Sequence, residues 1–216
     1  YVVQNIPPNV LILLDISGSM MNFAYHDGYQ TPNDSSDDAP CTVSAPCMKY
    51  NWTGRPAANR YYGYFDPDQW YTYSSGVFSA AGPDNTTKLS NYWKGDFLNW
   101  LTMRRIDIMR KVLTGGRPSS DKIDGEIPDN EIRGLYMRVS ETVAAANTPF
   151  ITTGNKDVIF IFGTGNAGTS SFDAYQAQNN DTTNNTVSAG SNITSQASNQ
   201  SIKVNVRVPL PVEGVL

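Results

Sequence analysis

Continuous apolar runs and long polar stretches follow one another along this chain of 216 residues. Near the start, residues 9–15 read NVLILLD, an apolar run that ends abruptly in an aspartate. A run without polar alternation is typical of a central strand that is covered on both faces. The pattern therefore predicts a buried strand that ends at Asp15.

Residues 22–94 have the opposite character, with polar and aromatic residues, frequent turn signals and no helical period. We expect loops and short strands here, as an insertion after the first strand. Aromatic side chains of this insertion are expected to pack a small satellite core, which is a simpler explanation than an aromatic ligand site. They are Tyr61, Tyr62, Tyr64, Phe65, Trp70, Tyr71 and Tyr73.

Residues 95–116, GDFLNWLTMRRIDIMRKVLTGG, predict an amphipathic helix with Asp96 as its N-cap and a glycine pair as its end. At about 100° per residue, most of its apolar side chains share one face. They are Phe97, Leu98, Leu101, Ile108, Met109 and Val112. Arg105 falls in the middle of this face, so its guanidinium must either extend to solvent or meet a carboxylate. Arg105 is therefore a candidate for a structural ion pair.

The remaining residues, 117–216, predict a β-rich segment with strands at 131–140, 157–162 and 201–208. In the last of these strands, apolar and polar residues alternate, which indicates a half-exposed strand. Between the last two strands lies a tract rich in Asn, Ser, Thr and Gln. It predicts either a solvated loop or an unusual polar β segment.

Composition narrows the function classes. Charged residues make up 17% of the chain and the net charge is −4, without the basic stripe of a nucleic-acid-binding protein. No apolar run approaches the roughly 20 residues of a membrane span. The polar, lysine-poor and glutamate-poor composition is typical of secreted bacterial surface proteins, and a chain that starts at Tyr1 suggests a processed N-terminus.

The two cysteines, Cys41 and Cys47, predict a small-loop disulfide formed in an oxidising compartment. Two unrelated thiols are the alternative. A metal pair would need further ligands, and the chain has a single histidine, His26.

Asp15, Ser17 and Ser19 follow the first apolar run, and three kinds of chemistry compete for them: a nucleophile, a proton-transfer carboxylate or a metal site. A hydrolase elbow would need Gly-x-Ser-x-Gly, which neither serine has. Aspartic proteases place Asp-Thr/Ser-Gly at such a point, but here Ile16 intervenes and there is no second copy. An Asp-x-Ser-x-Ser turn instead offers three oxygen side chains on one side, which suits Mg²⁺ or Ca²⁺ and also Mn²⁺. We therefore favour a divalent-cation site.

Two further motifs are weaker. Residues 163–168, GTGNAG, match Gly-x-Gly-x-x-Gly after an apolar run, but no helical pattern follows, so a glycine-rich turn is the better explanation than a dinucleotide site. The acidic loop with Asp34, Asp37 and Asp38 lacks the ligand spacing of an EF-hand. We expect a solvated loop there, with accessory Ca²⁺ binding as the minor alternative.

The segment LILLDISGSM resembles the Asp-x-Ser-x-Ser adhesion site of von Willebrand factor A domains. Together with YYGYFDPDQWYTY, GDFLNWLTMRRIDIMRKVLTGG and the terminal EGVL, in this order, it resembles the N-terminal region of PilY-type proteins of bacterial type IV pili. The resemblance covers residues 1–116 well and residues 117–216 loosely. It implies a tip-located adhesin or biogenesis factor, and the longer family members have a C-terminal propeller domain.

This resemblance implies an α/β fold with a von Willebrand factor A-like (Rossmann-like) core, together with a β- and loop-rich insertion and additional strands. The first strand and site loop would occupy residues 1–21, the insertion 22–94, the A-domain helix 95–116 and the β-rich segment 117–216. Asp15, Ser17 and Ser19 would be metal ligands. The family's further ligands, a threonine and a second aspartate, are not recognisable, since residues 163–165, GTG, supply no carboxylate. An incomplete A-like core is therefore the alternative to a complete one.

We therefore expect a non-enzymatic protein on the bacterial surface, on a pilus or fimbrium. It would bind pilus components or a surface ligand through a divalent cation. The rival hypothesis is a structural subunit of a self-assembling surface filament, whose strands pair with those of neighbouring subunits.

Overall fold

The computed structural model describes residues 12–25, 50, 60–83, 91–126, 136–150, 158–162, 171–176 and 202–209. In chain order, the elements are η1 (Gly18–Met21), β1 (Gln69–Ser74), β2 (Val77–Pro83), β3 (Trp93–Lys94), α1 (Gly95–Thr102), α2 (Arg105–Thr114), β4 (Pro118–Ser119), β5 (Lys122–Asp124), β6 (Tyr136–Val139), α3 (Glu141–Asn147), β7 (Val158–Phe162), β8 (Ser171–Gln176), β9 (Ile202–Asn205) and β10 (Arg207–Pro209). No helix among these residues is long and apolar enough to cross a membrane.

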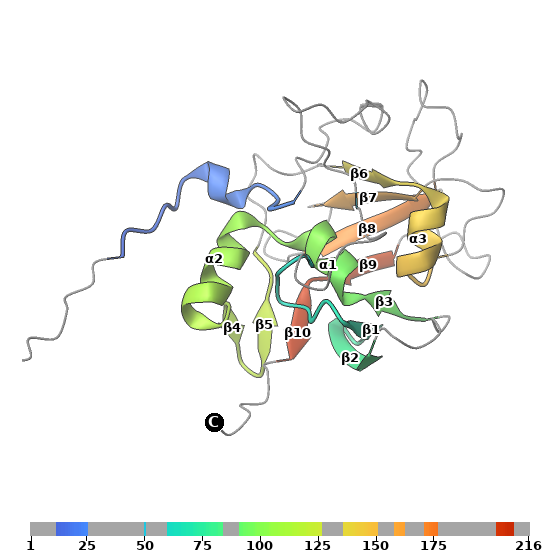
Figure 1. Ribbon diagram of the computed structural model, residues 1–216, viewed down its shortest axis with the longest axis horizontal. Helices are drawn as coiled ribbons and strands as arrows, with labels where there is room; N and C mark the ends of the chain where they lie inside the picture. Colours follow the sequence, from blue (N-terminus) through green and yellow to red (C-terminus); the bar gives the residue numbers. More distant parts are fainter. Residues whose placement is uncertain are drawn as a thin grey trace, which may run out of the picture.

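The strands form three antiparallel sheets (Figure 1). The largest has the order β6-β7-β8-β9, and two smaller sheets have the orders β2-β1-β3 and β10-β5-β4. In the β1–β2 hairpin, the connecting Ser75 and Gly76 have φ values of 50° and 80°. Positive φ at both central residues is the backbone that matches the twist of a tight hairpin.

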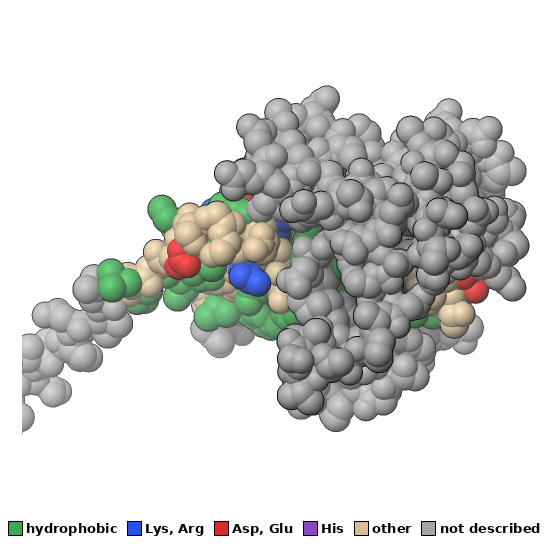
Figure 2. Space-filling view, turned by 90° about the horizontal axis from the view of Figure 1, so that it is seen from above, with side chains coloured by type: hydrophobic (Ala, Val, Ile, Leu, Met, Phe, Trp, Pro, Cys, Tyr) green, Lys and Arg blue, Asp and Glu red, His purple; other side chains and the backbone are tan. Residues whose placement is uncertain are grey.

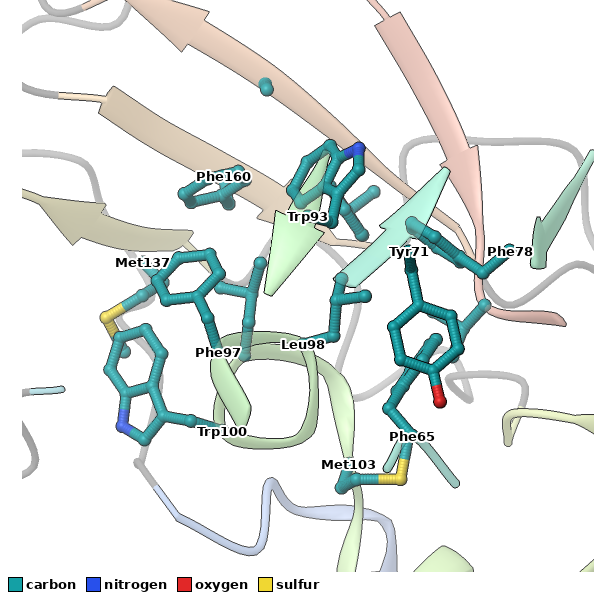
Figure 3. Packing of buried hydrophobic residues seen from close by; sticks show 14 of the residues in the cluster. Phe65, Tyr71, Phe78, Trp93, Phe97, Leu98, Trp100, Met103, Met137 and Phe160 are labelled. Atoms are coloured by element: carbon teal, nitrogen blue, oxygen red, sulfur yellow. The ribbon is translucent and has the colours of Figure 1, made fainter. Parts of the chain in front are cut away.

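Helix α1 lies at the centre of the molecule, and all of its residues are buried. Phe97 and Trp100 of this helix pack near Met137 and Phe160 of the large sheet, as Figure 3 shows. Trp93, just before the helix, contacts the ring of Phe172 with a centroid distance of 5.8 Å. The helix therefore joins the small β2-β1-β3 sheet to the large sheet through one continuous aromatic core.

Most of the predicted aromatic residues of the insertion belong to that same core, so the prediction of a separate satellite core is wrong. Tyr62 is an exception, because it is exposed. Tyr64, Phe65 and Tyr71 are buried in one cluster with the residues of α1 and the large sheet. Phe65 contacts Tyr71 and Phe78 edge to face, with centroid distances of 5.1 and 5.2 Å. The physical reason is that α1 is apolar on more than one side and therefore needs cover from the insertion as well as from the sheet.

The predicted first strand does not lie in a core. Its described part, residues 12–16, is extended without strand pairing, and Leu13 is 86% and Ile16 79% exposed. This segment projects from the body of the protein (Figure 1), and apolar side chains line it in the space-filling view (Figure 2). A strand requires a neighbour for its N–H and C=O groups, and the described residues provide none here.

The predicted helix over 95–116 is two helices, because its chain breaks at Met103 and Arg104. There the backbone is extended, with ψ values of 132° and 159°. The groups released from the helix bond to the N-terminal segment instead: Ala24 N donates to Met103 O at 2.9 Å and Arg105 N donates to Asn22 O at 3.0 Å. Tertiary hydrogen bonds thus replace helical ones at the break.

Both predicted ends of that helix can also be compared with the structure. Asp96 is not the N-cap, because Lys94 occupies that position and Asp96 lies in the first turn. The glycine stop is confirmed: Gly115 caps α2 with φ 84°, the left-handed conformation that glycine adopts without strain.

The three predicted strands of residues 117–216 are confirmed as β6, β7 and the β9–β10 pair. The last one is interrupted at Val206, and its halves pair with different sheets, β9 with β8 and β10 with β5. Strand β8 was not predicted, although Phe172 and Ala174, which are both buried, alternate in the manner of a half-buried strand.

An α/β organisation is confirmed, but the von Willebrand factor A-like core is not shown. Such a core is built on a mainly parallel sheet, whereas every strand pair in the described ranges is antiparallel. The described residues form a small α/β unit with antiparallel sheets.

Asn99, near the middle of α1, holds the loop of residues 60–66 against the helix. Its amide nitrogen donates to Tyr61 O and Phe65 O, each at 2.8 Å, and its amide oxygen accepts from Phe65 N at 3.0 Å. The loop passes so close that a Cβ on Gly63 would lie 2.1 Å from the Asn99 amide oxygen. A buried polar side chain is thus fully paired, as the low dielectric of a core requires.

Replacing Asn99 by leucine keeps the volume of the side chain but removes these hydrogen bonds. The Tyr61 and Phe65 groups would lose their partner inside the protein, and each such loss costs about 1–3 kcal/mol. We expect N99L to lower the free energy of unfolding by about 3 kcal/mol or more, measured by urea denaturation. V112A, at an exposed position of α2, should change it by less than about 0.5 kcal/mol. Equal stability of N99L and the parent would contradict this role.

Candidate functional site

Asp15, Ser17 and Ser19 come together in one turn, as the sequence motif suggests. The Ser17 N–H donates to a carboxylate oxygen of Asp15 at 2.8 Å, and the hydroxyl oxygens of Ser17 and Ser19 are 2.8 Å apart. All three residues lie at the surface, and the Ser17 N–H lowers the pKa of the Asp15 carboxyl. The turn therefore presents an ionised carboxylate and two converging hydroxyls to solvent.

This donor set fits part of a hard-cation site. Mg²⁺ and Ca²⁺ take oxygen ligands, six or more in number, from carboxylates, hydroxyls, carbonyls and water. One carboxylate and two hydroxyls supply fewer than that, so further oxygens would have to come from water or another molecule. Within the described ranges, no group of three or more His, Cys, Asp or Glu residues could hold a metal ion.

The 3₁₀ turn η1 continues directly from these residues. It begins after Ser17, and the carbonyls of Ser17 and Ser19 accept from the N–H groups of Met20 and Asn22 at 2.9 and 3.3 Å. The chain then enters the body of the protein at Phe23, which is buried and contacts Phe162 of β7 with a centroid distance of 4.6 Å. The exposed turn is thus separated from the buried Phe23 by only a few residues of chain.

The structure does not place Arg105 within the apolar face. Because the helix breaks before it, Arg105 begins α2 and its side chain is exposed; it donates to the carbonyl of Ser19 at 3.4 Å. The predicted ion pair is not among the described contacts of Arg105. The buried cation is its neighbour Arg104, which is 3% exposed, lies over the Phe23 ring at 4.2 Å and donates to Met21 O at 2.6 Å.

The first turn of α2 contains a buried carboxylate, that of Asp107. Asp107, 1% exposed, accepts from the N–H groups of Arg104 and Glu126 and from the hydroxyl of Tyr64. Its donors come from the residue before α2, from the insertion loop and from the segment after β5. Asp107 therefore ties the insertion loop and the segment after β5 to the start of α2.

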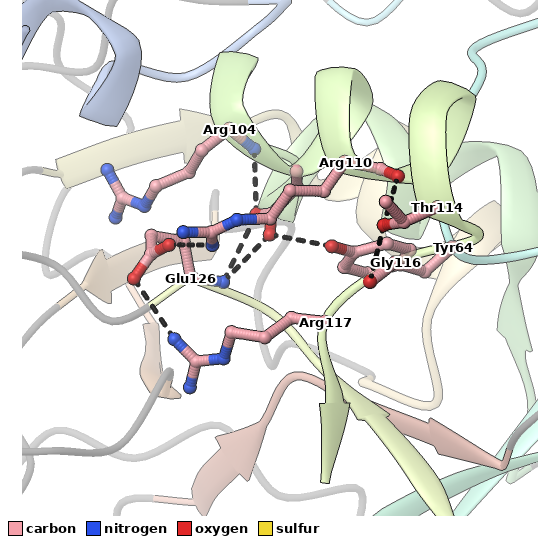
Figure 4. A network of polar contacts seen from close by, with 8 residues as sticks. Tyr64, Arg104, Arg110, Thr114, Gly116, Arg117 and Glu126 are labelled. Atoms are coloured by element: carbon pink, nitrogen blue, oxygen red, sulfur yellow. Dashed lines mark hydrogen bonds and ion pairs between the residues drawn. The ribbon is translucent and has the colours of Figure 1, made fainter. Parts of the chain in front are cut away.

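Two arginines complete this network. Glu126 forms ion pairs with Arg110 and with Arg117, the latter at 3.1 Å between Oε1 and Nη1 (Figure 4). The sequence patterns did not predict this network. The available signal was Asp107 at the third position of a helix, where a carboxylate accepts from the preceding backbone N–H, but the break that starts a new helix at Arg105 was not foreseen.

The pKa of the Asp107 carboxyl is raised to about 6, mainly by burial. Hydrogen bonds from the N–H groups of Glu126 and Arg104 and from the Tyr64 hydroxyl lower this pKa, but by less than burial raises it. Asp96 in α1 shows the same balance: burial raises its pKa, while the Tyr61 N–H and the Tyr50 hydroxyl lower it. A raised pKa often marks a catalytic acid. Here both carboxyls are buried and accept hydrogen bonds from donors of the protein itself. This pattern is typical of carboxyls that stabilise the fold.

Several sequence predictions concern residues outside the described ranges. These are the disulfide of Cys41 and Cys47, His26, the acidic loop with Asp34, Asp37 and Asp38, the GTGNAG turn at 163–168 and most of the polar tract before β9. Each of them stays a prediction.

Comparison with known proteins identifies the small α/β unit. A family model described as "PilY1 homolog, small alpha/beta domain" matches residues 55–206, more than half of the chain. The chain belongs to this PilY1-homolog family. A type IV pilus biogenesis factor PilY1 homolog from Xylella fastidiosa is 32% identical over 102 residues, which is 46% of this chain and 6% of that protein. No solved structure matches.

The PilY1-homolog match confirms the resemblance to PilY-type proteins, whereas the von Willebrand factor A-like part of the resemblance is not shown. The matched range, 55–206, leaves out the first 54 residues, where the resemblance was expected to be good, and includes most of residues 117–216, where it was expected to be loose. The matched range contains α1, α2, the Asp107 network and almost all of the three sheets. Asp15, Ser17 and Ser19 precede it, so the site turn lies outside the PilY1-homolog domain as the family model defines it. The two are nevertheless joined by the hydrogen bonds between residues 19–24 and the α1–α2 break.

The Asp107 pKa predicts how stability depends on pH. Because the folded pKa is raised from 3.8 to about 6, the protonated form is favoured in the folded state. This contribution is fully present below about pH 4 and is lost as the pH rises to about 6. The free energy of unfolding of the parent should therefore decline by up to about 3 kcal/mol between these pH values because of Asp107. We expect this part of the decline to be absent in D107N, measured by urea denaturation at a series of pH values.

The matched control is D121N, which removes an exposed carboxyl paired with Lys122. Its pH profile should follow the parent between about pH 4 and pH 6. A D107N profile that declines as steeply as the parent's would show that Asp107 does not titrate in this window.

Proposed function

We propose that this chain serves a type IV pilus-associated protein of the bacterial surface, as a binding module rather than an enzyme. It would bind pilus components or a surface ligand through a divalent cation held by Asp15, Ser17 and Ser19. Support for the pilus association comes from the match to the PilY1-homolog domain and from the relative's name. Because the chain spans only 6% of that relative, the function of the whole protein is part of this proposal.

The observation behind the cation site is the geometry of the turn. The two serine hydroxyl oxygens are 2.8 Å apart, and the Ser17 N–H orients the Asp15 carboxylate next to them. A cation would stabilise this arrangement, because its coordination by the two hydroxyl oxygens would replace the hydrogen bond between them. A von Willebrand factor A-like core around this turn, as the sequence motif implies, is also part of the proposal. It would need strands beyond those described.

The charge of the turn suits a bridging role. With one carboxylate and two neutral hydroxyls, a bound divalent cation keeps net positive charge and accepts a further anionic oxygen from a partner. Arg105, whose guanidinium lies against the Ser19 carbonyl, adds positive charge beside the turn. This favours a ligand that presents a carboxylate.

Cation binding can be measured directly on the purified chain. We expect titration calorimetry with Mg²⁺, Mn²⁺ and Ca²⁺ to detect binding of at least one ion, and D15A to weaken it about tenfold or more because the only carboxylate of the turn is lost. D121A, which removes an exposed carboxylate far along the chain, serves as the control and should bind as the parent does. Unchanged binding by D15A would leave the turn without a metal function.

A second function is favoured by the exposed segment 12–16, which we propose pairs with strands of a neighbouring subunit in a filament. Its aliphatic side chains are between 49% and 86% exposed, and an unpaired apolar strand is a ready template for another chain. In this role the segment would add to an open sheet edge of a second copy.

Sedimentation velocity over a micromolar concentration series tests self-association. We expect the parent to form concentration-dependent oligomers and L13K to be monomeric, because a buried lysine in the paired strand is costly. L113K changes a leucine that is also exposed, but on α2, and should associate as the parent does. A parent that is monomeric at every concentration would remove the filament hypothesis.

A further inference from the structure

We propose that Arg104 and Arg105 are positioning residues for the oxygen cluster of Asp15, Ser17 and Ser19. Through them the small α/β domain would hold the turn in the conformation in which its hydroxyls converge. This inference rests on the proposed cation function, and it assigns to the α1–α2 break a role in that function.

The first observation is a short antiparallel pairing between the N-terminal segment and the break. Phe23 and Arg104 form an isolated β bridge, flanked by the bond from Ala24 N to Met103 O and that from Arg105 N to Asn22 O. These backbone groups would bond within a continuous helix, so the pairing stabilises the end of α1 at this point. It also fixes the point at which the turn leaves the domain.

The second observation is that both arginine side chains reach back toward the turn. Arg104 Nη1 donates to Met21 O at 2.6 Å, and Arg105 Nη1 donates to Ser19 O at 3.4 Å. Arg104 is itself held, because its guanidinium lies over the Phe23 ring and its backbone N–H donates to Asp107. The buried network is thus continuous with the carbonyls of η1.

Together these contacts restrict the motion of the turn. The Ser19 carbonyl accepts from both Asn22 N and Arg105 Nη1, while the Ser17 carbonyl accepts from Met20 N. A backbone rotation that separates the two serine hydroxyls would break at least one of these hydrogen bonds. Preorganised ligands bind a cation more tightly than ligands that must first be ordered.

Charge and positioning predict opposite results for Arg105. A guanidinium near a cation repels it, so if charge were its only effect, removing Arg105 would tighten cation binding. If Arg105 holds the turn, its removal loosens the turn and weakens binding. The sign of the change therefore separates positioning from simple electrostatics.

The experiment measures Mn²⁺ affinity by calorimetry and, on the metal-free chain, amide hydrogen exchange of Met20 and Asn22. We expect R105A to weaken Mn²⁺ binding about fivefold, in line with the net contribution of one typical exposed hydrogen bond, and to speed exchange at these two amides. R105K keeps the charge and a donor and should stay within about twofold of the parent. K122A, which removes a lysine side chain that pairs with Asp121, should match the parent in both measurements.

R104K provides an independent test at the buried position, since lysine cannot both lie flat on Phe23 and reach Met21 O in the same way. It should speed exchange at Met20 and Asn22 while strand β1 stays protected, which shows that the domain remains folded. Unchanged exchange in both R105A and R104K, or tighter Mn²⁺ binding by R105A, would overturn the proposal. A parent that binds no Mn²⁺ would refute the cation function, while the exchange measurements would still decide whether the arginines hold the turn.

Discussion

Complete burial of α1 is the constraint on which the rest of the structure depends. The helix carries polar groups into the core, above all Asp96 and Asn99, which are inaccessible to solvent. Such groups are tolerated only when their hydrogen bonds are made inside the protein. The loop of residues 60–66 makes those bonds and so lies across the helix. The insertion is consequently part of the domain core.

The same requirement explains the polar network at the start of α2. Asp107 is enclosed by donors from the residue before α2, from the insertion loop and from the segment after β5. Removing one hydrogen-bond partner of such a buried group destabilises the protein by more than the net stabilisation that the intact hydrogen bond provides. The network therefore gives the domain a defined arrangement next to the N-terminal segment. Arg104 contributes to the network through its backbone N–H and contacts the N-terminal segment through its side chain.

The site turn is hydrogen-bonded to the domain but differs from the domain core in its exposure to solvent. Asp15, Ser17 and Ser19 are exposed, and their described side-chain hydrogen bonds join residues two positions apart, whereas the neighbouring Phe23 is buried. The apolar segment before the turn is also exposed. In the described part of the chain, no strand pairs with residues 12–16, whose apolar side chains lie beside the exposed oxygens of the turn.

The sequence by itself determined the local features of this protein. The Asp-x-Ser-x-Ser turn, the glycine that ends α2 and the strands β6, β7 and β9–β10 all follow from short-range rules of turn chemistry and periodicity. Only the tertiary structure decided that the helix breaks at Met103, that Arg104 and not Arg105 is the buried cation, and that the apolar run before Asp15 stays exposed. These outcomes depend on hydrogen-bond and packing partners far away in the chain, and the periodicity of a single segment contains no information about them.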